Sequence, residues 1–116
     1  MAGIVFFATE DEDRAVEFYR EKVGAEVWLE QDGCTILQHD EFKFGFCERD
    51  RTEDCGILTF YYDDRAGVDE CYDRLADLAE EPPVKNEQYE IYHFFLEDPD
   101  GRTVEFQTFL HPLPEG

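Results

Sequence analysis

Residues 94–109 read FFLEDPDGRTVEFQTF. The central DPDG, residues 98–101, is typical of a tight turn, because proline presets φ and glycine tolerates positive φ. The residues before the turn are rich in aromatic and aliphatic side chains, and those after it, 103–107, alternate polar with apolar ones, which predicts two antiparallel strands joined by this turn. Glu105 stands among apolar neighbours in the second strand, so the hairpin is also the first candidate for a functional site.

The chain contains an internal repeat with an offset of 53 residues, which extends this organisation to the whole sequence. GIVFF at 3–7 aligns with GILTF at 56–60, and VEFYRE at 16–21 aligns with DECYDR at 69–74. Apolar residues then recur at helical spacing in each half, at Ala15, Val16, Tyr19 and Val23 in the first and at Val68, Cys71, Tyr72, Leu75 and Ala79 in the second. Thr9 and Asp11 can cap the first helix, and Gly24 can end it.

The remaining segments of both halves predict strands. Residues 26–31 and 34–39 flank the Asp32-Gly33 turn, and 42–48 follows Asp40-Glu41. In the second half, the loop at 80–88 can hide a short strand at 83–85, ahead of the hairpin around DPDG. We therefore predict one α+β domain over 1–116, built from two tandem βαβββ modules at about 3–48 and 56–110, with a linker at 49–55 and a tail at 111–116.

The charge of the chain restricts its partners. Thirty acidic residues against ten basic ones give a net charge of −20, which repels phosphate backbones and disfavours nucleic-acid binding. We expect a halophilic protein with acids spread over its surface; the alternative is an acidic mimic that binds a basic partner. No apolar run reaches the ~20 residues of a membrane span, and the N-terminus does not resemble a signal peptide, so we expect a cytoplasmic location.

The four cysteines are Cys34, Cys47, Cys55 and Cys71, and they include no C-x-x-C motif. Free thiols are the expectation for a cytoplasmic chain. If Asp40-Glu41 is a two-residue turn, Cys34 lies directly opposite Cys47. Such a pair could oxidise or bind a soft metal, or it could simply pack as two small apolar residues.

The repeated module resembles a known family. IVFFATEDEDRAVEFYREKVGAEV at 4–27 and LEDPDGRTVEFQ at 96–107, used within a duplicated βαβββ plan, resemble the vicinal oxygen chelate superfamily of glyoxalases, bleomycin-resistance proteins and extradiol dioxygenases. The resemblance covers residues 3–110. It implies a cupped mixed sheet with helices on its outer face, and a metal site with ligands from the opening and closing strands of each module.

Only one of these implied ligand positions holds a metal-binding side chain. Strand alternation places Glu105 on the cavity face, but the other three positions carry Ile4, Gly45 and Ile57. One carboxylate does not hold a divalent ion against water, because catalytic sites usually keep about three protein ligands. We therefore predict no cofactor, with a divalent metal in a rearranged site as the alternative.

The cavity face is instead expected to be aromatic. If Val27 and Leu29 face the helix, Trp28 faces the cavity together with Glu26 and Glu30. The predicted ligand-binding residues are Phe6, Trp28, Tyr61, His93, Phe95, Glu105 and Gln107. Aromatic walls with a few carboxylates suit a small hydrophobic or cationic ligand.

His93 leaves two interpretations open. It could form a catalytic general acid–base couple with Glu105, or it could donate a structural hydrogen bond. A bulge near the DPDG turn could also rotate residues 91–97 and turn His93 to the other face. We predict a metal-free small-molecule binding protein that forms a homodimer; the alternative is a metal-dependent lyase, isomerase or dioxygenase.

Overall fold

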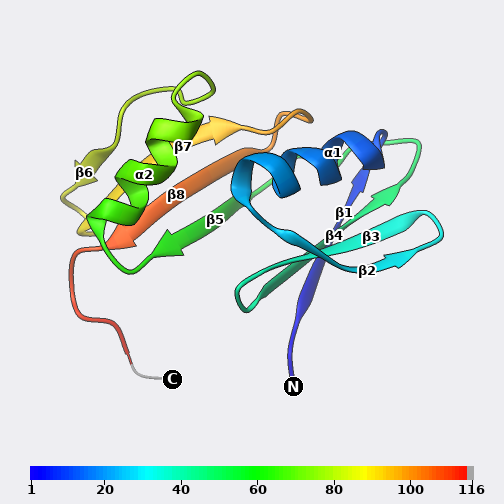
Figure 1. Cartoon of the computed structure of the whole chain (residues 1–116), viewed down its shortest axis with the longest axis horizontal. Helices are drawn as coiled ribbons and strands as arrows, with labels where there is room; N and C mark the ends of the chain where they lie inside the picture. The colour runs from blue at the N-terminus through cyan, green and yellow to red at the C-terminus, as the bar shows by residue number, and fades with distance from the viewer. Residues whose placement is uncertain (115–116) are drawn as a thin grey trace. The chain divides into compact units, whose positions relative to one another are not determined.

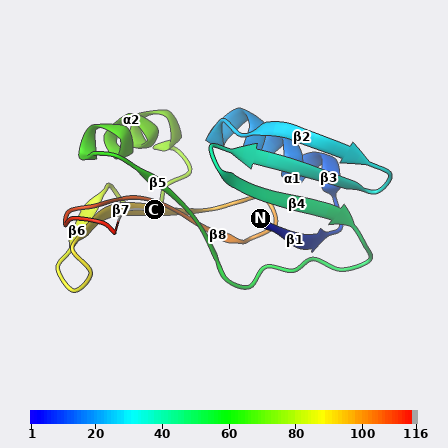
Figure 2. The same ribbon diagram turned by 90° about the horizontal axis from the view of Figure 1, so that it is seen from below.

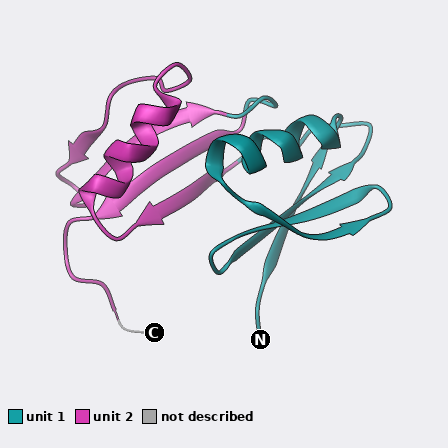
Figure 3. Ribbon diagram, in the orientation of Figure 1, with its two compact units in different colours: residues 1–55, 98–101 teal, residues 56–97, 102–116 magenta. Residues whose placement is uncertain are grey.

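The computed structural model describes residues 1–114, which form two compact units. Unit 1 comprises residues 1–55 together with 98–101, and unit 2 comprises residues 56–97 and the chain from 102 onward (Figure 3). The two residues at the end of the predicted tail, 115 and 116, lie outside the described part. Within residues 1–114, no helix is long and apolar enough to cross a membrane.

Both units carry the predicted βαβββ order (Figure 1). Unit 1 contains β1 (Ile4–Thr9), α1 (Glu12–Phe18), the π-helical turn η1 (Tyr19–Val23), β2 (Glu26–Gln31), β3 (Cys34–His39) and β4 (Phe42–Glu48). Unit 2 contains β5 (Ile57–Tyr62), α2 (Arg65–Leu75), β6 (Val84–Asn86), β7 (Ile91–Glu97) and β8 (Thr103–Phe109). The starts of β1 and β5 differ by the 53 residues of the sequence repeat, and so do the starts of α1 and α2.

The two four-stranded sheets have the same topology. Their orders are β1-β4-β3-β2 and β5-β8-β7-β6, and in each the opening strand runs parallel to the closing strand while the other pairs are antiparallel. In unit 2, α2 lies along one face of the sheet (Figures 1 and 2). We call the sheet face opposite a unit's own helix its open face. The predicted α+β class and tandem modules are confirmed.

The core of unit 1 lies between α1, η1 and the sheet. Phe44 and Phe46 of β4 are fully buried, and the ring of Tyr19 packs against both of them. Phe7 of β1 stacks on Phe46, with the ring centroids 5.9 Å apart. Because successive residues of a strand face opposite ways, the intervening Gly45 lies on the open face, as predicted.

The core of unit 2 follows the same alternation. Phe106 stacks on Phe60 and on Phe94, and Phe94 also meets the ring of Tyr72 from α2. These residues are therefore on the helix side of the sheet. Residues at odd positions of β7 and β8, which include Glu105, lie on the open face.

The DPDG turn belongs to unit 1, although its strands β7 and β8 belong to unit 2. The buried hydroxyl of Tyr19 donates a hydrogen bond to Asp98 Oδ2 at 2.7 Å. Asp100 accepts hydrogen bonds from the hydroxyl of Thr9 and from the guanidinium of Arg14. The hydrogen bond to Asp100 raises the pKa of Arg14, because it stabilises the charged guanidinium. Asp100 thus anchors the turn to the start of α1, and Asp98 anchors it to the first residue of η1.

Strand β2 contains a bulge that the sequence prediction did not include. Val27 pairs with Leu37 and Leu29 pairs with Ile36, so the register skips Trp28. A bulge interrupts the alternation of side chains. Leu29 therefore shares the open face with Ile36, and the prediction that it faces the helix is wrong.

The bulge also changes the orientation expected for Glu30. Glu30 pairs with Thr35, whose hydroxyl donates to Glu12 of α1 at 2.6 Å. This pair is therefore on the helix side, and the prediction that Glu30 faces the cavity is wrong. Trp28 does lie on the open face, since the Nζ atom of Lys43 is 5.0 Å from the centre of its indole ring.

The hairpin of β3 and β4 places Cys34 directly opposite Cys47, as the two-residue turn predicts. Their Cα atoms are 4.1 Å apart, and a disulfide joins the two residues. The expectation of free thiols is wrong for this pair. Of the other two cysteines, Cys55 is exposed and Cys71 is buried, and both are free thiols.

Candidate functional site

Three polar side chains meet on the open face of unit 2. The Nδ1 atom of His93 lies 2.6 Å from Glu105 Oε2, and the hydroxyl of Thr59 donates to Glu105 Oε1 at 2.9 Å. His93 is 7% exposed and Glu105 is 9% exposed. A buried carboxylate is costly unless hydrogen bonds compensate it, and here each of its oxygens has a partner.

The strand register brings these residues together. Thr59 of β5 lies beside Glu105 of β8, and His93 of β7 lies opposite Gln107, diagonal to Glu105. Diagonal neighbours across antiparallel strands are about 7–8 Å apart at Cα, which is within reach of two long side chains. No bulge separates β7 from β8, so residues 91–97 keep the predicted facing.

The contact between His93 and Glu105 has a chemical consequence. An ionised carboxylate only accepts hydrogen bonds, so an ionised Glu105 requires the imidazole proton on Nδ1. The Nε2 atom of a neutral His93 is then an acceptor. The pair can therefore accept a proton or a hydrogen bond from a bound molecule at Nε2.

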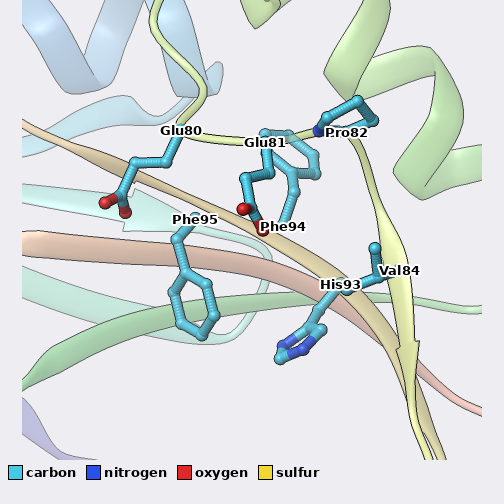
Figure 4. A pocket seen from close by; sticks show the side chains of 7 residues that line it. All are labelled: Glu80, Glu81, Pro82, Val84, His93, Phe94 and Phe95. Carbon is cyan, nitrogen blue, oxygen red and sulfur yellow. The ribbon is translucent and has the colours of Figure 1, made fainter.

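A pocket of about 490 Å³ opens beside this pair, at the edge of β7. Its lining residues are Glu80, Glu81, Pro82, Val84, His93, Phe94 and Phe95. Figure 4 shows the side chains of His93 and Phe95 on the same side of β7, with the ring of Phe94 turned the other way. The ring centroids of His93 and Phe95 are 4.9 Å apart.

The pocket exists because the chain bows away from β7. Glu80 N donates to Phe95 O at 3.0 Å, and Val84 pairs with His93. Three residues, 81–83, therefore pass opposite the single residue Phe94. Two of the three are prolines, which lack the N–H that a strand ladder needs.

The pocket wall at residues 80–84 was not among the predicted site residues, and neither was Thr59. The sequence predicted a short strand at 83–85, and the structure places β6 at Val84–Asn86. The EEPP segment at 80–83 is the sequence feature that could have indicated this pocket wall, because a proline pair before a short strand prevents continuous pairing with the neighbouring strand.

The predicted ligand-binding residues divide between the units. Phe6 and Trp28 lie on the open face of unit 1, and both are 49% exposed. Unit 2 carries the other five, namely Tyr61, His93, Phe95, Glu105 and Gln107. Of these five, only His93 and Phe95 line the pocket at β7.

The residues at the implied metal-ligand positions do not fit a metal. Ile4 and Ile57 are aliphatic, and the space beside Gly45 is filled by the ring of Phe6, since a Cβ on Gly45 would lie 2.7 Å from Phe6 Cδ1. The fourth position, Glu105, uses both carboxylate oxygens in the contacts described above. Among residues 1–114, no three His, Cys, Asp or Glu side chains are grouped so that they could hold a metal ion.

Sequence comparisons identify no relative: no protein-family model matches the chain, and no curated protein matches it. Solved structures do match. A glyoxalase/bleomycin resistance protein/dioxygenase from Alicyclobacillus acidocaldarius has a TM-score of 0.79 at 17% identity, over 96% of this chain and 92% of that one. A lactoylglutathione lyase from Agrobacterium tumefaciens has a TM-score of 0.76 at 23% identity, over 93% and 92% of the two chains.

A third structure extends the match to the whole chain. A glyoxalase/bleomycin resistance protein/dioxygenase from Nocardioides has a TM-score of 0.77 at 15% identity and covers 100% of this chain and 87% of its own. At these identities the likeness shows the fold and not the activity. The chain therefore shares its fold with these structures, and this agrees with the fold that the sequence resemblance implied.

Proposed function

We propose that the protein binds a small hydrophobic or cationic molecule in the pocket beside β7 and uses no metal to do so. The observation that carries the proposal is the combination of rings and carboxylates in one space of about 490 Å³. Phe95 and His93 provide the rings, and Glu80 and Glu81 provide the carboxylates.

Each part of this lining contributes a different interaction. The face of Phe95 can stack on a flat ring or attract a cation, which contributes about 0.5–1 kcal/mol at an exposed site. Glu80 and Glu81 attract positive charge through a carboxylate on each side chain. Glu105 fixes the orientation of His93, so that Nε2 can accept a hydrogen bond from an N–H or O–H of the ligand.

Two further observations support binding without chemistry. Two of the matching structures carry the name glyoxalase/bleomycin resistance protein/dioxygenase, which covers a resistance protein as well as enzymes and is therefore compatible with a binding role. The aliphatic residues Ile4 and Ile57 and the filled space at Gly45 leave Glu105 as the only donor at the implied metal positions.

The test is a calorimetric titration with three probes of one aromatic scaffold: methylquinolinium, neutral methylquinoline and quinoline carboxylate. We expect methylquinolinium to bind about threefold to tenfold more tightly than the neutral probe, and the carboxylate not to bind. Phe95→Ala should weaken the binding of the cationic and neutral probes, because it removes the stacking surface.

A pair of charge-matched variants separates the pocket from the overall field. Glu80→Gln/Glu81→Gln should abolish the preference for the cation, whereas Glu17→Gln/Glu70→Gln, at exposed positions outside the pocket, should keep it. Equal loss in both variants would assign the preference to the net charge. Absence of binding by all three probes would contradict the proposal.

The second candidate is an enzyme, and the contact of 2.6 Å between His93 and Glu105 favours it. One form is a general acid–base couple, and the other is a metal-dependent lyase, isomerase or dioxygenase with a rearranged site. Elemental analysis distinguishes the metal-dependent form: about one zinc, nickel, manganese or iron per chain that is lost in Glu105→Ala would support it and contradict metal-free binding.

We also propose that the protein is a homodimer in a high-salt cytoplasm. Four apolar side chains on the open face of unit 1 are between 38% and 49% exposed, namely Ile4, Phe6, Trp28 and Leu29. A contiguous apolar patch supports a protein interface. Light scattering during size-exclusion chromatography should give twice the chain mass in high salt, and Trp28→Glu should give the mass of one chain.

A further inference from the structure

A second, smaller pocket lies in unit 1, and Cys47 of the disulfide is one of the residues that line it. It has a volume of about 190 Å³ and is lined by Phe6, Phe7, Ala8, Cys47, Arg49, Arg51 and Glu53. This volume is the share of about six water molecules in the liquid, at ~30 Å³ each, so it suits a molecule of a few heavy atoms. The site described in unit 2 uses none of these residues.

The wall opposite Cys47 is fixed by hydrogen bonds to β1. Arg49 N donates to Thr9 O at 2.9 Å, and Glu53 N donates to Ala8 O at 2.9 Å. Glu53 Oε1 accepts a hydrogen bond from Ala8 N at 2.7 Å. The residues after β4 are thus held along the edge strand, and Arg49 and Arg51 are positioned at the pocket.

The charge of this pocket is opposite to that of the chain. Its lining includes two arginines and one carboxylate, that of Glu53, in a protein whose net charge is −20. Glu48, the neighbouring acid at the end of β4, directs its Oε1 to the backbone N of Glu12 at 2.9 Å. The lining of the pocket therefore carries one more positive than negative side chain, although the molecule as a whole repels anions.

We propose that this pocket admits a small anionic thiol and that the Cys34–Cys47 disulfide exchanges with it. The thiolate attacks Cys47 Sγ, the bond to Cys34 breaks, and Cys34 leaves as a thiolate that takes a proton from water. A second thiol attacks the mixed disulfide and releases Cys47 as a thiol, together with the small disulfide. The protein pair gains two electrons, and the two small thiols lose them.

A disulfide that exchanges with small thiols fits the cytoplasmic location that we propose for this protein. Disulfides in a reducing cytoplasm are rare, and those that occur are usually transient and redox-active. Cys47 is buried and lines the pocket, so the pocket is the route by which a thiol reaches Cys47. Its partner Cys34 is partly exposed. The exchange does not depend on the ligand pocket of unit 2, and either proposal can fail alone.

The experiment measures how fast three thiols of similar size reduce the disulfide: mercaptoethanesulfonate (anionic), mercaptoethanol (neutral) and cysteamine (cationic). Each rate is divided by the rate of the same thiol with hydroxyethyl disulfide, which removes differences in intrinsic nucleophilicity. The net charge alone ranks cysteamine first. We expect mercaptoethanesulfonate to be first, ahead of mercaptoethanol by about threefold to tenfold.

Two charge-matched double variants locate the effect. Arg49→Ser/Arg51→Ser should remove the preference for the anion, and Arg20→Ser/Lys85→Ser, at exposed positions outside the pocket, should keep it. Sodium chloride at about 1 M should also reduce the preference, because it shortens the screening length to about 3 Å. In the Cys34→Ser variant, the disulfide of mercaptoethanesulfonate should modify Cys47, as mapped by mass spectrometry.

Three results would overturn the proposal. The first is a ranking in which mercaptoethanesulfonate is no faster than mercaptoethanol. The second is an unchanged preference in Arg49→Ser/Arg51→Ser. The third is that Cys34 and Cys47, once the intact protein has been reduced, remain free thiols after treatment with an oxidised small thiol.

Discussion

The imidazole Nδ1 of His93 lies 2.6 Å from Glu105 Oε2, although twelve positions separate the two residues in the chain. The antiparallel pairing of β7 and β8 creates this contact, and Thr59 of β5 completes it from the other side. The carboxylate thus serves as the centre of a small hydrogen-bond network on the open face of unit 2, beside the ring of Phe95.

The network predicts a stability difference between two glutamates of the same hairpin. Glu105→Ala leaves the buried His93 without its acceptor, so the free energy of unfolding should fall by about 1–3 kcal/mol. Glu97→Ala, at the exposed end of β7, should change it by less than about 0.5 kcal/mol. Urea denaturation measures both, and equal effects would show that the network does not stabilise the fold.

The close approach of Phe6 to Gly45 predicts a coupling between β1 and β4. A Cβ on Gly45 would lie 2.7 Å from Phe6 Cδ1, so Gly45→Ala forces the ring to move. We expect a loss of about 1 kcal/mol in unfolding free energy, which is absent when Phe6 is also replaced by alanine. A double-mutant cycle in urea measures the coupling; additive effects would contradict the contact.

The buried hydroxyl of Tyr19 should stabilise the DPDG turn. Tyr19→Phe removes the donor to Asp98 Oδ2, which is 2.7 Å away, and should cost about 1.5–3 kcal/mol because the acceptor is a buried carboxylate. Tyr89→Phe, at an exposed tyrosine, is the matched control and should be neutral. Thermal unfolding compares the two, and a neutral Tyr19→Phe would refute the prediction.

The two free cysteines should differ in reactivity. Burial raises the pKa of Cys71, against a smaller opposite effect of the hydrogen bond from Tyr62, so less of its thiol is ionised at neutral pH. Cys71 is also only 1% exposed, whereas Cys55 is exposed. Iodoacetamide should therefore modify Cys55 first in the folded protein and reach Cys71 only after unfolding; equal labelling by mass spectrometry would contradict this.

The net charge of −20 predicts that salt stabilises the fold. Raising sodium chloride from about 0.1 M to about 1 M shortens the screening length from about 10 Å to about 3 Å and weakens the repulsion between surface acids. The melting temperature should rise, and the rise should shrink when six exposed acids become amides: Glu10, Glu17, Glu21, Asp54, Asp63 and Glu70. An unchanged salt response in that variant would assign the effect to other causes.

The sequence by itself determined the secondary structure and its duplication. Turn residues such as Asp32-Gly33 and the DPDG segment mark chain reversals through local backbone preferences, and a repeat of 53 residues needs only the chain to be read against itself. Alternation between core and open face then placed Glu105 and His93 on one side, because side chains alternate with a period of two wherever a strand is regular.

Only the tertiary structure decided where that regularity fails. The bulge at Trp28 reversed the expected facing of Leu29 and Glu30, and the bow at 81–83 opened the pocket beside β7. Both depend on which residue of a neighbouring strand pairs with which, and pairing between distant segments is a property of the folded chain. The disulfide between Cys34 and Cys47 also required the two residues to lie directly opposite each other on neighbouring strands. The turn preference of Asp40-Glu41 made this register available, and the packed sheet fixed it.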